Sequence, residues 1–188
     1  MDNKLFNNFP ILETERLILQ QIIENDQDAL FKYWSDDMVT RYMNISKFKD
    51  KTEALDMIQL LNSLFEEKKA IRWGIYSKDL NCIIGTCGYN SGLEEDQFIA
   101  EIGYELGREH WGKGYMAEAL KSMLSYGFNF LHLNRIEAYV MVGNHQSASL
   151  LNKLGFKKEG LLREHGFYKG RFWDEYIFSL IKTKNNPS

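Results

Sequence analysis

The segment ELGREHWGKGYMAEAL, residues 105–120, constrains the fold more than any other part of the chain. It passes from the apolar alternation of a strand, through a glycine loop, into a helical pattern. Gly112 and Gly114 let the backbone approach a ligand closely and turn successive amides in one direction. The positive end of the following helix and the charge of Lys113 add to this field. The segment therefore predicts an anion site suited to a pyrophosphate; the alternative is a tight connection that binds nothing.

Two other phosphate loops fit the segment poorly. Gly107-x-x-x-x-Gly112-Lys113 is close to a Walker A loop, but Gly114 stands where that loop needs a Ser or Thr hydroxyl for magnesium. No later apolar strand ends in an Asp that could replace this ligand. A dinucleotide loop would need a third glycine, which is absent. The loop is thus expected to hold phosphates that need no metal, such as the pyrophosphate of coenzyme A, and a metal-dependent NTPase is a distant alternative.

Length and composition indicate one globular domain. The chain has 188 residues, 44% hydrophobic and 26% charged, and its net charge of −3 argues against a general nucleic-acid binder. The first ten residues lack a basic flank before an apolar core, and no apolar run approaches the ~18 residues of a membrane span. We therefore expect a cytoplasmic protein without membrane association. Cys82 and Cys87 are five residues apart on one predicted strand, roughly 16 Å, so we expect free thiols.

Hydrophobic periodicity predicts strands that first alternate with turns and later with helices, which favours a mixed sheet over a purely parallel one. Asn25 or Asp26, and then Asp36 or Asp37, are expected to cap the first two helices. The predicted strands are 15–22, 71–76, 82–89, 98–106, 135–142, 156–167 and 172–181. The predicted helices run to about 35, to 43, from 51 to 67, from the glycine loop through 131, and from 147 to 154.

Several motifs, in order, resemble the GNAT N-acetyltransferases. EIGYELGREHWGKGYMAEAL is similar to the acetyl-CoA loop of that family, and VGNHQSASLLNKLGFKKEG to its Asn-containing second half. TERLIL, IIGTCGY and GLLREHGFYKGRFWDEYIFSLIK complete the pattern. The resemblance covers about Leu12 to Lys182 and is nearest to the branch that contains the ribosomal-protein N-terminal acetyltransferases, the RimJ/RimL type. It implies a single GNAT domain over residues 1–188 with a core of about 12–182.

The chain departs from the family pattern in two places. The general loop, Gln/Arg-x-x-Gly-x-Gly/Ala, places Trp111, Gly114 and Met116 at its marked positions, and only Gly114 matches. WGKGY is nevertheless a usual form in the RimJ/RimL branch. At Leu151 many relatives carry a tyrosine that protonates the leaving thiolate, and leucine cannot do so.

The resemblance implies an α/β (α+β) fold, with a mixed, mostly antiparallel central sheet flanked by helices and with splayed fourth and fifth strands. Acetyl-CoA would lie in the splay and give its acetyl group to a primary amine by direct attack in a ternary complex. The acceptor would be a protein N-terminal α-amine or a small-molecule amine, and a homodimer is left open. The alternative is a non-catalytic module that senses acetyl-CoA. The residues implied in cofactor binding are Tyr104, Leu106, Trp111, Gly112, Lys113, Gly114, Tyr115, Met116 and Asn144.

Catalytic roles are assigned to Glu101 and Ser147. Glu101 is expected to act as the base or to anchor the acceptor, with Glu105 on the same strand face as a weaker choice; the alternative for each is a solvated carboxylate. Ser147 is expected to protonate the thiolate in place of the absent tyrosine, or else to be a plain helix cap. No metal is expected, because His110, His132, His145 and His165 lie in different segments without ligand spacing. Tyr33, Trp34 and Tyr42 are expected to line an acceptor pocket or to pack in the core.

Overall fold

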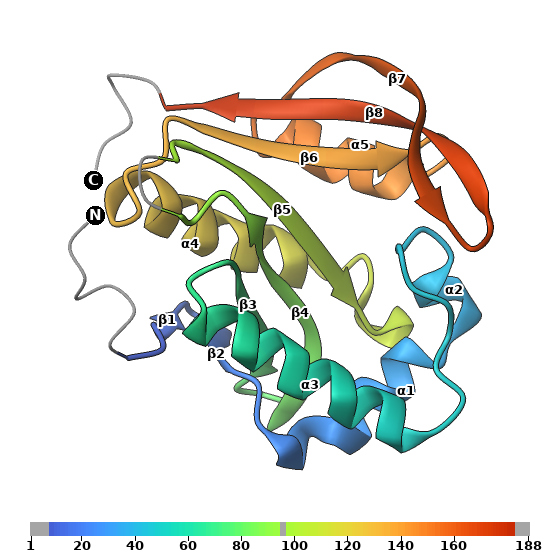
Figure 1. Ribbon diagram of the computed structural model, residues 1–188. Coiled ribbons are helices and arrows are strands. Elements are labelled where there is room, and N and C mark those ends of the chain that lie inside the picture. The colour runs from blue at the N-terminus through green and yellow to red at the C-terminus, as the bar shows by residue number, and fades with distance from the viewer. Residues whose placement is uncertain (1–7, 95–96, 183–188) are drawn as a thin grey trace.

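The computed structural model describes residues 8–94 and 97–182, which form one mixed sheet flanked by helices (Figure 1). Within these residues eight strands pair in the order β1-β2-β3-β4-β5-β6-β8-β7. Neighbours are antiparallel except β5 and β6, which are parallel. The predicted fold class is confirmed. The strands are β1 (Leu12–Glu13), β2 (Leu17–Gln21), β3 (Ile71–Ser77), β4 (Cys82–Ser91), β5 (Ile99–Leu106), β6 (Arg135–Met141), β7 (Lys157–Tyr168) and β8 (Arg171–Ile181).

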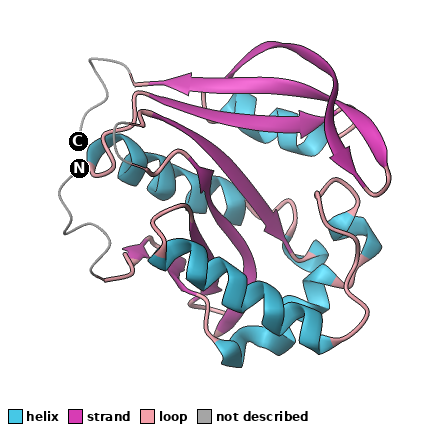
Figure 2. Ribbon diagram, viewed as in Figure 1, coloured by secondary structure: helices cyan, strands magenta, loops and turns pink. Residues whose placement is uncertain are grey.

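Helices cover both faces of the sheet: α1 and α3 lie in front of it, and α4 and α5 lie behind it (Figure 2). A large hydrophobic cluster forms between α4 and the sheet; it includes Met123 of α4 and Trp73 and Tyr89 of the sheet. A smaller cluster, which includes Leu30 and Ile58, joins α1 and α3 to the other face. The helices are α1 (Gln27–Trp34), α2 (Asp37–Thr40), α3 (Lys51–Glu66), α4 (Tyr115–Asn129) and α5 (His145–Lys153), with 3₁₀ turns η2 (Glu24–Asp26) and η3 (Arg108–His110).

Local side-chain hydrogen bonds explain where several helices begin. Asp50 accepts a hydrogen bond from the amide of Thr52 at 2.9 Å and caps α3, and Asp36 caps α2 as predicted. Asp26 precedes α1, but its carboxylate accepts from the amide of Ile23 and so closes the 3₁₀ turn instead. Most element bounds lie within two residues of the predicted ones, because capping and periodicity are short-range properties.

The last helix begins earlier than predicted. α5 starts at His145, because the side chain of Asn144 accepts a hydrogen bond from the amide of Ser147 at 3.2 Å. Asn144 is therefore the cap residue, and Ser147 lies within the first turn of the helix. The interpretation of Ser147 as the helix cap is wrong.

β5 and β6 separate after a short stretch of pairing. Their register joins Ile99–Glu101 only with Arg135–Glu137, whereas β4 stays paired with β5 as far as Leu106. Beyond Glu101, the edge of β5 that faces β6 has no strand partner among the described residues. This is the predicted splay, since β5 and β6 are the fourth and fifth strands when the two-residue β1 is not counted.

Candidate active site

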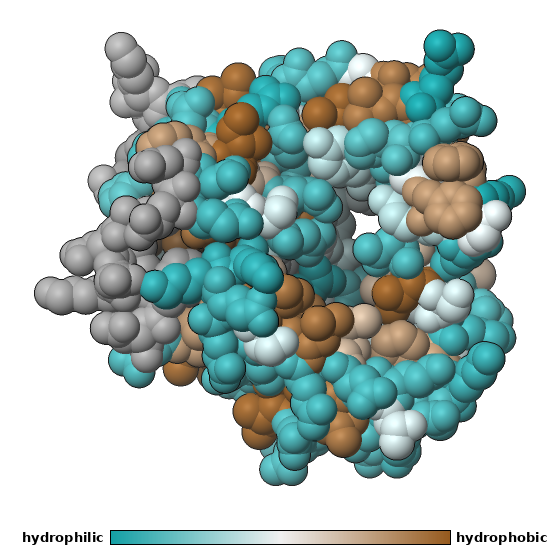
Figure 3. Space-filling view, viewed as in Figure 1, coloured by the Kyte–Doolittle hydropathy of each residue, from teal (hydrophilic) through white to brown (hydrophobic). Residues whose placement is uncertain are grey.

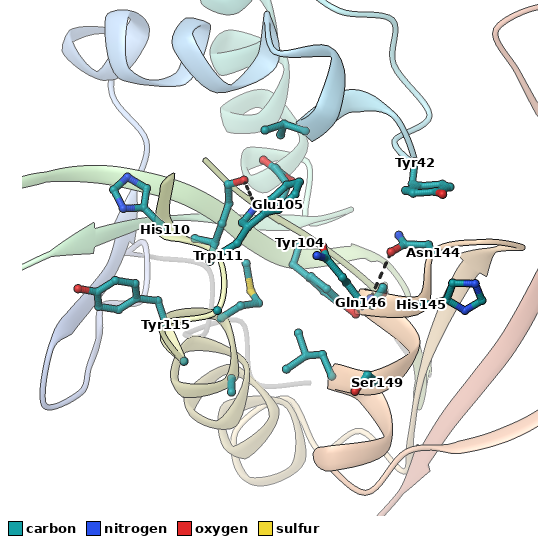
Figure 4. Close-up of a pocket in the computed structure, with 18 of the residues that line it drawn as sticks. Tyr42, Tyr104, Glu105, His110, Trp111, Tyr115, Asn144, His145, Gln146 and Ser149 are labelled. Atoms are coloured by element: carbon teal, nitrogen blue, oxygen red, sulfur yellow. Dashed lines mark hydrogen bonds between the residues drawn. The ribbon is translucent and has the colours of Figure 1, made fainter. Parts of the chain in front are cut away.

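A cavity of about 610 Å³ lies where β5 and β6 diverge (Figure 4). One end is formed by the glycine loop with the first turns of α4 and α5, and the other by α2 and the residues that follow it. Of the residues predicted to bind the cofactor or catalyse the reaction, the cavity is lined by Tyr104, Leu106, Trp111, Gly112, Gly114, Tyr115, Met116, Asn144 and Ser147. Lys113 and Glu101 are not among the lining residues.

The glycine loop presents open backbone to this cavity. Gly112 and Gly114 have φ angles of 74° and 82°, in the left-handed region that favours glycine. A Cβ at Gly112 would meet no atom within 4 Å, and one at Gly114 would meet only the Arg16 guanidinium, at 3.4 Å. α4 begins at the next residue, so its unpaired amides and dipole face the same space. The loop can thus hold a pyrophosphate through its backbone.

An arginine that the sequence analysis did not single out braces this loop. Arg16 donates from Nη1 to the carbonyl of Lys113 at 3.1 Å, and its guanidinium lies 4.5 Å from the ring centre of Tyr115. It also forms a salt bridge with Glu118 at 2.7 Å. Burial alone would raise the pKa of Glu118, but hydrogen bonds from Thr14 and Arg16 lower it below the ordinary value. Arg16 belongs to the TERLIL motif, which was the only sequence indication of this role.

Two hydroxyl groups meet at the splay. The hydroxyls of Tyr104 on β5 and Ser147 on α5 are 2.7 Å apart, and both side chains line the cavity. Burial raises the pKa of Tyr104 to about 12, so its phenol stays protonated. Leu151, on α5, is fully buried in the hydrophobic core and does not line the cavity. The family resemblance implied only that Tyr104 binds the cofactor, and the approach of its side chain to Ser147, 43 residues later, has no local sequence signature.

The two candidate carboxylates differ in position. Glu105 lines the cavity, is buried, and forms an ion pair with Arg72 while accepting hydrogen bonds from Thr86 and, at 3.2 Å, from the indole of Trp34. Glu101 shares the same face of β5 but, within residues 8–94 and 97–182, accepts a side-chain hydrogen bond only from Asn90, at 3.0 Å. The cavity therefore has a carboxylate whose charge is already compensated, and Glu101 lies further back along the strand.

The aromatic residues divide between core and cavity. Tyr33 and Trp34 pack in the smaller cluster, and the Tyr33 hydroxyl donates to the carbonyl of Ile83 at 2.7 Å. Tyr42 lines the cavity and donates to the carbonyl of Gly143 at 3.0 Å, which connects the α2 side to the end of β6. Only Tyr42 of the three is placed to meet an acceptor.

His110 also lines the cavity, and it is buried rather than exposed on a loop. Its Nδ1 atom has no hydrogen-bond partner among the described residues. Burial lowers its pKa, with Lys113 and Lys32 acting in the same direction against Glu109. The ring is therefore neutral near pH 7.

Other chemistries find little support in residues 8–94 and 97–182. In that part of the chain no cluster of three His, Cys, Asp or Glu side chains could hold a metal ion, and no helix is long and apolar enough to cross a membrane. Cys82 and Cys87 are free thiols, as predicted. Burial raises the pKa of Cys87 to about 12, so this thiol is not an activated nucleophile.

Comparison with known proteins identifies the class. A model of the acetyltransferase (GNAT) domain matches residues 16–157, so the chain belongs to the GNAT family of acetyltransferases and uses acetyl-CoA as its acetyl donor. The predicted family, enzyme class and cosubstrate are confirmed, and the sensing module is not the favoured interpretation.

Particular relatives agree with the predicted branch. The chain is 51% identical to the uncharacterized N-acetyltransferase p20 of Bacillus licheniformis, over 92% of this chain and 97% of the relative. It is 25% identical to the [ribosomal protein uS5]-alanine N-acetyltransferase of Escherichia coli, over 92% and 90%. The structure of RimL, a ribosomal L7/L12 α-N-protein acetyltransferase, in complex with coenzyme A superposes with a TM-score of 0.81 at 20% identity, covering 92% and 98%, which shows a shared fold.

Proposed function

We propose that this chain transfers the acetyl group of acetyl-CoA to the α-amine of a polypeptide N-terminus by direct attack within a ternary complex. One observation carries the proposal: a continuous cavity runs from the glycine loop, past the splay, to α2, so both reactants can be held together. Holding them together removes much of the barrier of a bimolecular reaction. The named activity of the Escherichia coli relative supports a polypeptide N-terminus as the acceptor.

In this proposal the cofactor is bound mainly by backbone groups of the protein. The amides of residues 112–116 bind the pyrophosphate, and the free edge of β5 at Tyr104 pairs with the pantetheine arm and polarises the thioester carbonyl. The carbonyl of Leu106 already accepts from the Trp111 indole at 2.8 Å, so Trp111 fixes the end of this edge. Asn144 uses its oxygen to cap α5, which leaves its NH₂ group for the pantetheine.

The compensated charge of Glu105 favours an α-amine over a lysine. An α-amine with a pKa of about 7.7–8.0 is about 10–15% neutral at pH 7, whereas a lysine with a pKa near 10.4 is less than ~0.1% neutral. Glu105 is already bound to Arg72 and is a poor base for a charged lysine. An α-amine needs only modest help, which we assign to Glu101 as base or as anchor for the incoming ammonium, acting through water.

Thiol release with matched acceptors tests this function. Purified protein is incubated with acetyl-CoA and a peptide with a free N-terminus and no lysine, or the same peptide N-terminally blocked and carrying one lysine. Polyamines and aminoglycosides serve as further acceptors. We expect turnover above background hydrolysis with the first peptide alone. Turnover only with the lysine peptide or a small amine would overturn the N-terminal assignment, and tight CoA binding without turnover on any acceptor would favour the sensing module.

We also propose that residues 1–188 act as one domain with a core of about 12–182. The strand order supports this, because β8 lies beyond the family match at 157 yet pairs between β6 and β7. Removing β8 would leave β7 without a partner, so the domain needs the chain as far as Ile181.

A further inference from the structure

The hydroxyls of Tyr104 and Ser147 are 2.7 Å apart in the part of the cavity where β5 leaves β6, which is where the proposed function requires the thioester. Both groups line the cavity, and Tyr104 comes from the strand edge that diverges from β6 (Figure 4). Ser147 is held by its own amide, which donates to Asn144 at 3.2 Å. Because the Ser147 Oγ is 2.7 Å from the Tyr104 hydroxyl, one of the two donates to the other.

We propose that Tyr104 is a positioning residue that donates its hydroxyl hydrogen to Ser147 Oγ and thereby directs the Ser147 hydroxyl hydrogen at the departing thiolate of coenzyme A. This inference rests on the proposed acetyl transfer. A phenol is the stronger donor of the two groups, and a donor chain polarises each successive hydroxyl. Tyr104 thus acts from β5 on the hydroxyl that Ser147 presents from α5.

The difference in pKa between the Tyr104 phenol and a thiol decides whether the hydroxyl pair transfers a proton to the sulfur or only hydrogen-bonds to it. Tyr104 has a pKa of about 12, whereas a thiol has one of about 8.5. Complete proton transfer from the phenol to the thiolate is therefore unfavourable by more than about 10³-fold. The pair stabilises the sulfur charge by hydrogen bonding and keeps its own protons. In the balanced reaction the amine nitrogen bonds to the acetyl carbon, the carbon–sulfur bond breaks with its electron pair on sulfur, and the proton lost from nitrogen ends on the thiol through solvent.

Tyr104→Phe removes a single oxygen and so tests the proposed hydrogen bond from Tyr104 to Ser147. With whichever amine the native protein acetylates, single-turnover rates should fall about 10-fold in Tyr104→Phe, while the acetyl-CoA Kd stays within about twofold. The single-turnover rate of Ser147→Ala should fall by at least the same factor. The double variant should be no slower than Ser147→Ala, since Tyr104 acts only through Ser147. Tyr126→Phe, a buried tyrosine on α4 outside the cavity, should leave both quantities unchanged.

A Tyr104→Phe rate within twofold of the native rate would overturn the inference. The inference would also be overturned if the rate losses of the two single variants multiplied in the double variant, because Tyr104 and Ser147 would then act separately. If Tyr104→Phe raised the acetyl-CoA Kd by the same factor as it lowered the rate, Tyr104 would be assigned to cofactor binding, which would also overturn the inference. If the peptide N-terminus fails but another amine is acetylated, the proposed acceptor is wrong, and the same comparison with that amine still decides the role of Tyr104.

Discussion

At Gly114 we expect the backbone to matter more for acetyl-CoA binding than the charge of the neighbouring Lys113. Its φ of 82° strains any β-branched side chain, and its open side faces the cavity. We expect Gly114→Val to weaken acetyl-CoA binding at least 10-fold by calorimetry. Lys113→Ala should weaken it less than about fivefold, because this exposed side chain does not line the cavity and a solvent-exposed ion pair is worth about 1 kcal/mol or less.

Gly170 is a matched control for this experiment. It has a φ of 76° in the β7–β8 turn, with open space around a Cβ, and lies outside the cavity lining. Gly170→Val should lower stability by a similar strain and leave the Kd unchanged. Normal CoA binding by Gly114→Val would show that the pyrophosphate lies elsewhere.

Glu101 is tested by removing its charge and keeping its shape. Glu101→Gln should lower kcat/KM by about 10²-fold if it acts as base, with little change in acetyl-CoA affinity. Activity should then shift toward higher pH, where more of the amine is already neutral. A pH–rate profile that keeps its native position and height would leave Glu101 as a strand-face carboxylate that accepts from Asn90.

Glu105 is expected to matter for stability instead. Its side chain and that of Arg72 are 6% and 13% exposed, so Glu105→Gln leaves a guanidinium charge buried without its counter-ion. We expect a loss of about 3 kcal/mol in the free energy of unfolding by urea. Glu109→Gln breaks the exposed pair with Lys32 and should cost less than about 1 kcal/mol. Equal losses in the two variants would contradict the compensated state assigned to Glu105.

Among the elements, the β7–β8 hairpin contacts the end of α2 beside the cavity, although none of the lining residues belongs to the hairpin. Lys169 at its turn donates to the carbonyl of Thr40 at 2.6 Å and of Arg41 at 3.3 Å, at the end of α2. Burial lowers the pKa of this lysine. The molecular surface is hollowed between α2 and the β6–β8 half of the sheet (Figure 3). The hairpin therefore positions α2, whose residues line the end of the cavity assigned to the acceptor.

Lys169→Met keeps the apolar stem and removes the donors. We expect the KM for the acceptor to rise severalfold while the acetyl-CoA Kd is unchanged, because only the α2 side is released. Lys182→Met is the control, since Lys182 donates to the carbonyl of Phe128 at the far end of α4. Steady-state kinetics that show the same KM change in both variants would contradict a specific role for the hairpin.

For the molecule as a whole, the short β5–β6 pairing leaves two parts of the sheet joined by few residues. The proposed cofactor contacts both parts, from the glycine loop and from α5. A ligand at 100 times its Kd stabilises the folded state by about 2.7 kcal/mol, which for a chain of this size raises Tm by roughly 5–11 °C. We expect this shift with acetyl-CoA and a smaller one with ADP at the same concentration, because ADP lacks the pantetheine arm and should bind more weakly. Equal shifts at equal concentration would mean that the pantetheine arm adds no binding free energy and does not lie in the splay.

Short-range physics made much of this protein predictable. The strand, glycine loop and α4 follow from periodicity and backbone freedom within residues 105–120, and Asp36 and Asp50 mark helix starts through contacts two or three residues away. These interactions depend on neighbours in sequence, so the sequence contains them directly. The ordered motifs also sufficed to predict the family.

The pairings that build the site were decided by tertiary structure. Arg16 reaches Glu118 across 102 residues, and Tyr104 reaches Ser147 across 43. Glu101 and Glu105 look equivalent by their even spacing, yet only Glu105 meets Arg72 and the cavity. Each outcome depends on which strands are neighbours and where β5 leaves β6. Strand order is set by packing the whole sheet against its helices, and no local pattern specifies that choice.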